Sequence, residues 1–446
     1  MKWILPIGSD LDLAGMSSTI HILRGLGSGS QGQVYEVAIQ DQRAALKWYY
    51  PSCLRLDPEL RERLTQCIRA GQPTDSFLWP LALLEGHQGL ARHGELVSHS
   101  FGYLMNIRSA EFVPALEHYA SRLQLTIATV LGTCLRLCSA FHALHSKGFC
   151  YKDISIANLF MDPNGGRILI CDNDNVGIEG IGSAAVLGTP GFMAPEVLLR
   201  QARPGRGSDL FSLAVLLFRL LTRHDPFKGM IESGIECLDE QARLKLYGLD
   251  PVFIFHPTDQ RNRPDPEAHS SALLTWPIYP RNLQDCFVQT FVHGLRDPRQ
   301  RVMTGEWIKQ FAATLDRRSL CPSCGQENFP DPPPARTHCW HCGCELSPST
   351  VLECETALVT LAEGNQLHPH HFNRLISIDL QTPIGVVAAN PNRPELIGLK
   401  NLSDVPWQAE LQTGDVLTVP PGRSTNLALT ASVRTSHGKV IVKKLG

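Results

Sequence analysis

Hydrophobic and polar positions divide the chain into three regimes. From about Ile20 to Leu315, strand-like and helix-like stretches alternate. A short segment rich in Cys, Pro and Gly then runs from Cys321 to Leu346 and contains FPDPPP, which cannot continue a helix or a central strand. From Val351 onward, short β-branched runs such as VLTV are divided by turn clusters such as NPNRP. The pattern predicts a multidomain α+β protein that ends in a small all-β domain, a sandwich or a barrel.

Within the first regime, the elements change from strands to helices. Three strands are expected between His21 and Tyr50, and a glycine-rich turn separates the first two. The segment DPELRERLTQCIRA predicts a helix, because it has an acidic start with Pro58 in a first-turn position. After about Leu116 the chain turns mostly helical, with one short hairpin around the turn DPNGGR. An antiparallel sheet with one helix therefore precedes a mainly helical part.

Composition narrows the possible functions. The 446 residues carry 41 Lys+Arg against 43 Asp+Glu, a formal net charge of −2. This balance gives no overall attraction to nucleic acid or an anionic membrane, so neither partner is expected. No uninterrupted apolar run approaches the roughly 18 residues of a spanning helix, and the start of the chain lacks a convincing secretory signal. We expect a soluble, cytoplasmic protein.

A glycine-rich segment, GSGSQGQV at residues 27–34, lies between two expected strands and matches G-x-G-x-x-G-x-V. Glycines in such a turn let the backbone approach phosphate oxygens and present N–H groups to them. A glycine-rich hairpin without a ligand is about as common, so the motif alone leaves both interpretations open. The candidate nucleotide-binding positions in it are Gly27, Ser28, Gly29, Gly32 and Val34.

Lys47 lies on the next expected strand, two residues after Ala45 and fifteen beyond Gly32. A cation at this place can reach the α- and β-phosphates and be held by a carboxylate on a helix. Glu62, or less favourably Glu59, would supply that carboxylate. The alternative is that Glu62 is a solvated helix charge. Ala45, Lys47 and Glu62 therefore join the candidate nucleotide site.

Two acids and an amide follow the long helical stretch. Asp153 and Asn158 lie five residues apart, which suits a pair in which the acid takes the proton of a substrate hydroxyl and the amide binds a metal. Asp172, fourteen residues beyond Asn158, ends the apolar strand RILIC and is placed to ligate Mg²⁺. Asp153, Lys47, Asn158 and Asp172 are the candidate catalytic residues, and Asn158 and Asp172 the candidate ligands of the active-site metal.

These motifs, in this order, resemble those of the eukaryotic-type protein kinases. Residues 188–196, GTPGFMAPE, resemble the end of an activation segment, and residues 208–213, SDLFSL, the start of the family's central buried helix. The string DPRQR at 297–301 resembles a late element whose Arg pairs with the A-P-E glutamate, here Glu196. The resemblance covers about two thirds of the chain, roughly Ile20 to Leu315.

The resemblance implies a bilobal protein-kinase fold that binds ATP with Mg²⁺ or Mn²⁺ between its lobes and phosphorylates Ser or Thr hydroxyls of a protein. Met105 then resembles the gatekeeper residue, and Asn106, Ile107 and Arg108 the hinge around adenine. Asp209 is expected to hold the catalytic loop rather than to take part in the chemistry.

Departures from the family pattern affect this chemistry. Residues 151–153 read YKD where H-R-D is usual, and residues 172–174 read DND where D-F-G is usual. The tyrosine and the asparagine could replace apolar packing with a hydrogen bond. Asp174 takes the place of a glycine, which should restrict flipping of the backbone in the metal-binding turn. It also adds a second carboxylate near the metals. Ser155 replaces a lysine that neutralises the moving phosphoryl group.

Two other functions stay open. A pseudokinase could bind nucleotide, or only a partner, without transferring phosphate; the presence of all four candidate catalytic residues favours an active enzyme. A small-molecule kinase would tolerate a similar catalytic loop. The segment Gly188–Glu196 argues against it, because in the family this segment forms a platform for a peptide, and Thr189 resembles the residue typical of Ser/Thr-directed members.

Control by phosphorylation of the activation segment is not expected to be strong. In many family members the Arg before the catalytic Asp clamps a phosphate on that segment. Lys152 stands there instead, and an ammonium cannot make the planar, two-pronged contact. From Asp172 to Glu196, only Ser183 and Thr189 carry a hydroxyl acceptor.

The strings KDIS at 152–155 and CDNDN at 171–175 resemble a bacterial subgroup of these kinases. That subgroup is associated with tellurite-resistance-type von Willebrand factor A proteins and a PP2C-type phosphatase. The resemblance implies a substrate of the first kind, an opposing phosphatase of the second kind, and a role in a signalling or stress-response module.

Two C-x-x-C pairs, each followed by Gly, dominate the middle segment: Cys321 with Cys324, and Cys339 with Cys342. Four thiolates at this spacing suit a tetrahedral, structural Zn²⁺ in a zinc ribbon. The alternative is reduced thiols or a redox pair. His338, His341 and Cys344 are spare ligands.

The tail contains His368, His370 and His371 in LHPHHF, which we interpret as a solvated turn rather than a metal site. Its β-rich pattern loosely resembles forkhead-associated domains but lacks their phosphothreonine-reading residues in the right order. A protein-interaction module is expected. The predicted division is an extension at 1–19, kinase lobes at 20–108 and 109–316, a zinc ribbon at 317–347 and a β-rich interaction domain at 348–446.

Overall fold

The computed structural model describes residues 3–12, 19–85, 100–180, 188–330, 338–346 and 350–444. The chain forms two compact units. One comprises Met1–Leu123, Arg136–Arg263 and Gln289–Arg301, and the other comprises Gln124–Leu135, Pro264–Val288 and Val302–Gly446.

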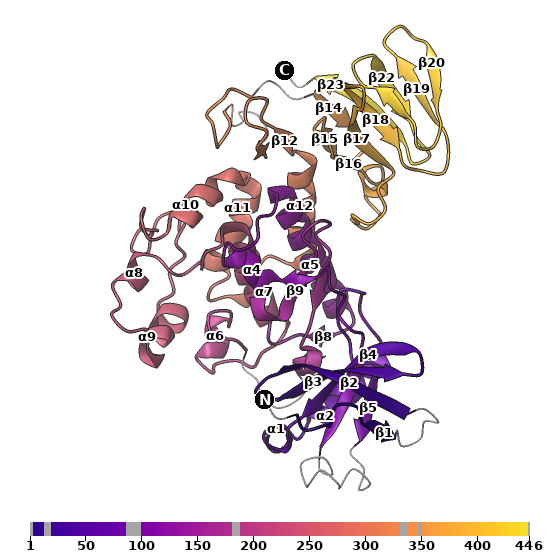
Figure 1. Cartoon of the computed structure of the whole chain (residues 1–446). Coiled ribbons are helices and arrows are strands. Elements are labelled where there is room, and N and C mark those ends of the chain that lie inside the picture. The colour runs from indigo at the N-terminus through magenta and orange to yellow at the C-terminus, as the bar shows by residue number, and fades with distance from the viewer. Residues whose placement is uncertain are drawn as a thin grey trace. The chain divides into compact units, whose positions relative to one another are not determined.

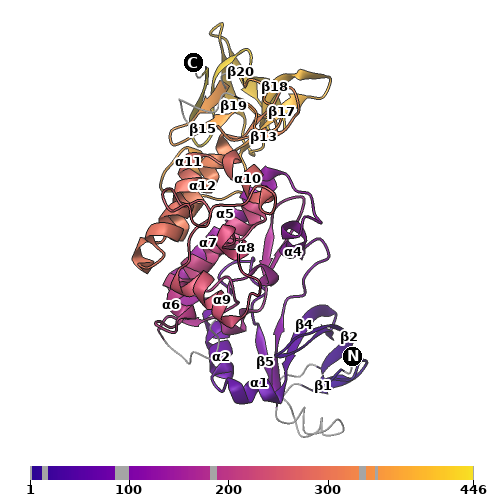
Figure 2. The ribbon, with the colours of Figure 1, turned by 90° about the vertical axis from the view of Figure 1, so that its left-hand side faces the viewer.

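A six-stranded antiparallel sheet opens the first unit (Figure 1). In spatial order its strands are β1 (Asp10–Asp12), β2 (Thr19–Ser28), β3 (Gly32–Ile39), β4 (Gln42–Tyr49), β6 (Phe101–Met105) and β5 (Ala82–Glu85). Helices α1 (Pro51–Leu56) and α2 (Leu60–Ala70) follow β4, and α2 lies beside β5 (Figure 2). The three strands and the helix predicted before residue 71 are therefore confirmed.

The N-terminal residues belong to this sheet rather than to a separate extension. Strand β1 pairs with β2, and Leu5 and Leu11 are buried in the same core as the strands. Trp3 covers Gly25 so closely that a Cβ there would lie 2.0 Å from the indole ring. The first lobe accordingly includes residues 3–12, which the sequence analysis left outside it.

The rest of the first unit is mainly helical, as predicted. Long helix α5 (Ile127–Ser146), which belongs to this unit from Arg136 onward, leads to the catalytic loop, and α7 (Arg206–Thr222) is buried from Ser208 onward except at Arg219. The hairpin predicted at DPNGGR is formed by β9 (Leu159–Met161) and β10 (Ile168–Ile170). Its shorter elements include β7 (Val113–Pro114), α4 (Ala115–Tyr119), β8 (Phe149–Cys150), η2 (Ile156–Asn158), η3 (Asn173–Asn175), β11 (Gly177–Ile178) and α6 (Pro195–Leu198). Others are α8 (Met230–Ser233), α9 (Glu240–Leu244), η4 (Lys245–Leu249), η6 (Gln289–His293) and η7 (Pro298–Gln300).

Among the helices of the described residues, α5 is long and apolar enough to cross a membrane by length and composition. The sequence shows no uninterrupted apolar run here, because Arg136, His142 and His145 interrupt the helix. Buried positions make up 61% of the apolar window, and the core helix of a folded domain meets the same criterion.

The second unit carries helices, the cysteine segment and the C-terminal sheets. Its later elements begin with α10 (Ser270–Thr275), η5 (Trp276–Ile278), α11 (Arg281–Val288) and α12 (Thr304–Asp316). The short strands β12 (Ser319–Leu320) and β13 (Glu327–Asn328) then form a hairpin around the first cysteine pair. Arg318 ties this hairpin to the β domain: its guanidinium donates to Glu327 at 2.5 Å and to the carbonyl of Glu363 at 2.8 Å.

The C-terminal residues form two antiparallel sheets around one core, which fits the small all-β domain predicted. The six-stranded sheet runs in the order β15 (Leu358–Thr360), β14 (Thr350–Glu353), β23 (Lys439–Lys444), β22 (Thr430–Arg434), β19 (Trp407–Leu411) and β20 (Val416–Val419). The four-stranded sheet runs in the order β16 (Gln366–Leu367), β17 (Gly385–Asn390), β18 (Arg393–Asn401) and β21 (Ser424–Asn426). The core includes Leu352, Val387, Leu399 and Trp407 from both sheets. The short helix η8 (Pro369–His371) follows β16.

A buried ion pair fixes the end of the activation segment in the first unit. Both terminal nitrogens of Arg301 donate to the carboxylate of Glu196 at 2.8 Å, as the resemblance implied. The Arg301 side chain is fully buried, and it also donates to the carbonyls of Gly294 and Gly207. The guanidinium donors thus connect Arg301 to the nearby Gly294 and to two positions about a hundred residues earlier, Glu196 and Gly207.

We expect Arg301→Met to lower the free energy of unfolding by about 3–5 kcal/mol, because removing one partner of a buried pair leaves the other charge uncompensated. Urea unfolding followed by intrinsic fluorescence would measure this. Arg299→Met is the matched control, since Arg299 is exposed and pairs only locally with Asp297; its effect should stay within about 0.5 kcal/mol. Equal midpoints for the two variants would contradict the assignment.

Candidate active site and cysteine cluster

The glycine-rich turn joins β2 to β3, and its glycines have different roles. At Gly27 and Gly29 an added Cβ would meet nothing within 4 Å, so the protein itself does not require glycine there. The open space suits the close approach of a ligand to the backbone. Gly32 differs, because a Cβ would lie 2.2 Å from the carbonyl oxygen of Trp48 on β4. Gly32 therefore allows β3 and β4 to pack closely.

The neighbouring positions line up across the sheet. Val34 pairs with Gly27 on one side and with Lys47 on the other, and Ala45 pairs with Met105. Ser28 lies at the end of β2, where its hydroxyl is 2.9 Å from that of Tyr50. Asn106 and Ile107 follow β6 directly, at the place expected of a hinge.

Lys47 is buried and contacts two carboxylates. Its ammonium lies 2.5 Å from Asp172 and 2.5 Å from Asp174, and it also donates to the side chain of Gln31 at 3.2 Å. Burial would lower the pKa of Lys47, but Asp174 and Asp172 outweigh that cost and raise it above its ordinary value.

The prediction that Glu62 of the helix holds Lys47 is wrong. Glu62 lies on the exposed face of α2 and accepts a hydrogen bond from Gln66 one turn later. The residue of α2 that faces the site is Arg63, which binds Asp57 through both terminal nitrogens and donates to the backbone carbonyl of Asp174. The alternative interpretation, that Glu62 is a solvated charge, is therefore confirmed.

Asp174 is the most enclosed carboxylate of the site. Besides Lys47, it accepts hydrogen bonds from the hydroxyls of Tyr49 at 2.5 Å and Tyr103 at 2.8 Å. Burial alone would raise the pKa of Asp174, but Lys47 and the two hydroxyls hold it below its ordinary value. The pKa of Asp172 is instead raised, by burial and by the charge of Asp174. The sequence reasoning missed both tyrosines, which belong to a hydrophobic core of the sheet and give no local sign of a polar role.

Hydrogen bonds fix the turn from 172 to 174. Asp172 has a left-handed backbone, with φ 58°, which is uncommon outside glycine. The amide of Asn173 donates to the carbonyl of Leu78 at 2.8 Å and is fully buried. Tyr151 donates to the carbonyl of Cys171. Both residues thus replace the expected apolar packing with hydrogen bonds, as proposed, although each bonds to backbone rather than to the other.

Asp209 of α7 holds the catalytic loop, as predicted. Its carboxylate accepts the backbone N–H groups of Tyr151 at 2.7 Å and Lys152 at 2.9 Å, and lies 3.1 Å from Nε2 of His145. Lys152 has a positive φ of 70°, so these bonds hold a backbone conformation that lysine rarely adopts. A buried acid therefore holds the backbone of this loop.

Asp153 and Asn158 meet at the end of this loop. The amide nitrogen of Asn158 donates to the backbone carbonyl of Asp153 at 3.1 Å, which directs the donor inward and leaves the amide oxygen as the group that could ligate a metal. Thr189 donates to the carboxylate of Asp153 at 2.6 Å. This bond links the activation segment to the candidate base.

The donor set fits a magnesium nucleotide. Asp172 and Asn158 supply carboxylate and amide oxygens, the ligands that Mg²⁺ prefers. Lys47 supplies a cation, and the open glycines at 27 and 29 supply room beside backbone N–H groups. Asp153 supplies a carboxylate that is free of cationic partners among the described residues.

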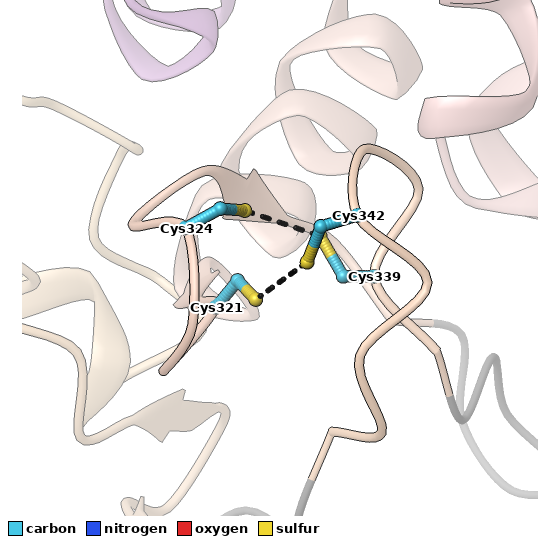
Figure 3. A group of neighbouring side chains, drawn as sticks. All are labelled: Cys321, Cys324, Cys339 and Cys342. Carbon is cyan, nitrogen blue, oxygen red and sulfur yellow. Dashed lines mark hydrogen bonds between the residues drawn. The ribbon is translucent and has the colours of Figure 1, made fainter.

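The four paired cysteines come together in the second unit, and Figure 3 shows their sulfur atoms turned toward one another. All four lie within 4.8 Å of each other, with 3.5 Å between the sulfurs of Cys321 and Cys342 and 3.7 Å between those of Cys324 and Cys339. Backbone N–H groups of Cys342 and His341 outweigh burial and lower the pKa of Cys339 to about 6. The cluster is compatible with zinc, and the spare ligands lie outside it.

The prediction that the histidines of the tail lie in a solvated turn is wrong. His368, His370 and His371 are all buried around η8, with their rings 4.3 to 5.6 Å apart. Nε2 of His371 lies 3.3 Å from Asp316, at the end of α12. Burial, and the charge that His371 would carry, lower the pKa of His370 to about 4. Short polar-rich strings give no sign of such burial, which involves contacts with distant residues such as Asp316 and Thr356.

Comparison with known proteins supports the kinase interpretation. Residues 104–275 match the protein kinase domain family. Over 258 residues the chain is 24% identical to a probable serine/threonine-protein kinase of Dictyostelium discoideum, DDB_G0282895, covering 53% of this chain and 14% of that protein. It is 25% identical over 231 residues to the probable serine/threonine-protein kinase MARK-A of the same organism, covering 48% and 20%.

A mammalian relative gives the same picture. Protein kinase C delta type of Mus musculus is 26% identical over 214 residues, covering 47% of this chain and 30% of that protein. The chain thus spans less than a third of the length of each of these relatives. Together these similarities support a eukaryotic-type protein serine/threonine kinase. The matched residues include Asp153, Asn158 and Asp172, but not Lys47.

Proposed function

We propose that the chain is a protein kinase that transfers the γ-phosphoryl group of ATP to a Ser or Thr hydroxyl. The observation that carries the proposal is the 2.5 Å contact between Lys47 of β4 and Asp172, which follows β10. It brings the candidate phosphate-binding cation, from outside the matched residues, to the candidate metal ligand within them.

The chain's own residues would divide the work. Bound ATP supplies the phosphoryl group, and Mg²⁺ supplies charge that stabilises its transfer. Asp172 and Asn158 would hold the metal, Lys47 would orient the phosphates, and Gly27 with Gly29 would let the backbone lie against them. Asp153 would position the substrate hydroxyl and accept its proton.

The class of substrate follows from the activation segment. Thr189 binds Asp153 beside the place where a hydroxyl must enter, and the segment is anchored through Glu196 and Arg301. This supports a peptide platform and hence a protein substrate. The finer proposal is a von Willebrand factor A-type substrate opposed by a PP2C-type phosphatase in a bacterial signalling module in the cytoplasm. Its support is the resemblance of the strings KDIS and CDNDN.

The proposal predicts different losses at the two acids. Asp153→Asn should lower phosphoryl transfer by a factor on the order of 10²–10⁴ while Mg-ATP still binds, because it removes the base. Asp172→Ala should weaken both binding and transfer, because it removes a metal ligand. Radiolabelled transfer to a co-encoded protein and calorimetric nucleotide binding would measure these effects.

Binding alone separates the enzyme from its alternatives. Mg-ATP at about a hundred times its Kd should stabilise the parent protein by about 2.7 kcal/mol. A parent protein without any nucleotide-induced thermal shift would refute the kinase proposal. A shift without transfer to any protein would favour the nucleotide-binding pseudokinase.

We also propose that the four clustered thiolates hold one structural Zn²⁺. Metal analysis should find one zinc per chain, and Cys324→Ser should lose it while nucleotide binding persists, since the cluster belongs to the other unit. Cys344→Ser is the matched control, because Cys344 lies beside Cys321 but is not one of the four clustered cysteines, so the variant should keep the metal. Metal-free protein with a folded ribbon would contradict the proposal.

Control of the kinase is proposed to come from partner binding rather than from phosphorylation of the activation segment. Ser183 lies outside the described residues. The surroundings of Lys152 support the proposal, because the neighbouring cation Arg63 is already bound to Asp57, at 2.8 and 2.5 Å, and is not available to clamp a phosphate. Burial, followed by the charge of Arg63, lowers the pKa of Lys152.

Ser183→Ala should therefore leave the initial rate within about threefold of the parent, because no two-pronged phosphate clamp is lost. Rates toward a protein substrate, before and after phosphatase treatment, would test this. If phosphatase treatment abolishes activity and Ser183→Ala does the same, Lys152 does bind a phosphate and this account of control is wrong.

A further inference from the structure

The two carboxylates on Lys47 come from one short turn but differ in surroundings. Both lie 2.5 Å from the ammonium. The Asp172 side chain keeps 35% of its surface exposed, whereas Asp174 keeps 1%. Asp172 is the candidate metal ligand, so its oxygens are needed by the metal in the working enzyme. Asp174 is then the carboxylate that remains for Lys47.

Two tyrosines give Asp174 a fixed orientation. Tyr49 and Tyr103 donate to different oxygens of its carboxylate, Oδ2 and Oδ1 respectively. Both rings are fully buried, and they stand on neighbouring strands β4 and β6. A carboxylate held by two hydroxyls and a cation cannot rotate without breaking at least one charged hydrogen bond.

Among the described residues, helix α2 brings no carboxylate into contact with Lys47. Its Glu62 is exposed, and Arg63 instead donates to the backbone carbonyl of Asp174 at 3.3 Å. The helix therefore contacts the turn that carries Asp174 rather than Lys47 itself.

We propose that Asp174 is the positioning residue that holds Lys47 toward the nucleotide phosphates, in place of a carboxylate on α2. The inference rests on the proposed kinase function. It assigns the third residue of the DND turn a role that glycine cannot have. Because the anchor lies two residues from Asp172, the phosphate cation and the metal ligand are set by one rigid turn, and their alignment does not depend on an ion pair from the helix.

The test compares matched amide substitutions in the full-length protein. Asp174→Asn keeps the shape and removes the charge; Glu62→Gln does the same on the helix, and Asp75→Asn controls for an exposed acid of the same lobe. Asp174→Asn should weaken Mg-ADP binding and raise KM for ATP on the order of tenfold, as expected for a lost buried charge contact. Its effect on kcat should be smaller, and the other two variants should stay within about twofold.

A double-mutant cycle shows whether Asp174 acts through Lys47. In a Lys47→Met background, Asp174→Asn should weaken Mg-ADP binding no further, and Tyr103→Phe alone should give an intermediate loss. Additive losses, an unchanged Asp174→Asn, or an equal loss in Glu62→Gln would overturn the inference. A general folding defect would instead lower kcat and the melting temperature without raising KM.

A measurement without nucleotide separates this inference from the kinase proposal. Acetylation of Lys47 at one fixed pH, followed by mass spectrometry, should be severalfold faster in Asp174→Asn than in the parent and unchanged in Glu62→Gln. If the parent binds no Mg-ADP, the kinase proposal fails and the positioning role with it. Unchanged acetylation in Asp174→Asn, with binding intact, would overturn the anchoring role alone.

Discussion

The burial of one ammonium group, that of Lys47, is the constraint around which the first unit is organised. An unpaired charge of this kind is too costly to keep out of water, so the fold must bring carboxylates to it. They come from the turn after β10, and this draws the sheet and the helical part together. Tyr49 and Tyr103 then complete the hydrogen bonding of a buried charge that one cation alone would leave half satisfied.

A second buried acid, Asp209, shapes the catalytic loop in a similar way. It binds the backbone rather than a side chain, so the sequence of the loop can vary while its path is kept. This explains why YKD can stand for H-R-D. Tyr151 donates a hydrogen bond to the carbonyl of Cys171, and Lys152 adopts a backbone conformation with positive φ. Tyr151 thus combines a hydrogen bond to the main chain with packing against Phe141.

The sequence predicted those parts of the site that short-range spacing determines. Lys47, Asp153, Asn158 and Asp172 follow from motifs whose local geometry is fixed by one turn or one strand end. The partner of Lys47 did not follow, because the direction of Glu62 depends on the rotation of α2 about its axis. Strand β1 was missed because three residues are too few to show a period, and its pairing with β2 is a tertiary effect.

The same limit explains the two outcomes in the second unit. The four cysteines could be grouped from sequence because each C-x-x-C pair is a local loop closed by glycines at positive φ, Gly325 and Gly343. The histidines of η8 lack such a local device: their segment contacts residues distant in sequence, among them Asp316, some fifty residues earlier in the chain. Chemistry that is built within one loop can therefore be predicted for this protein from its residues, whereas a partner brought by packing, such as Asp174 for Lys47, required the fold.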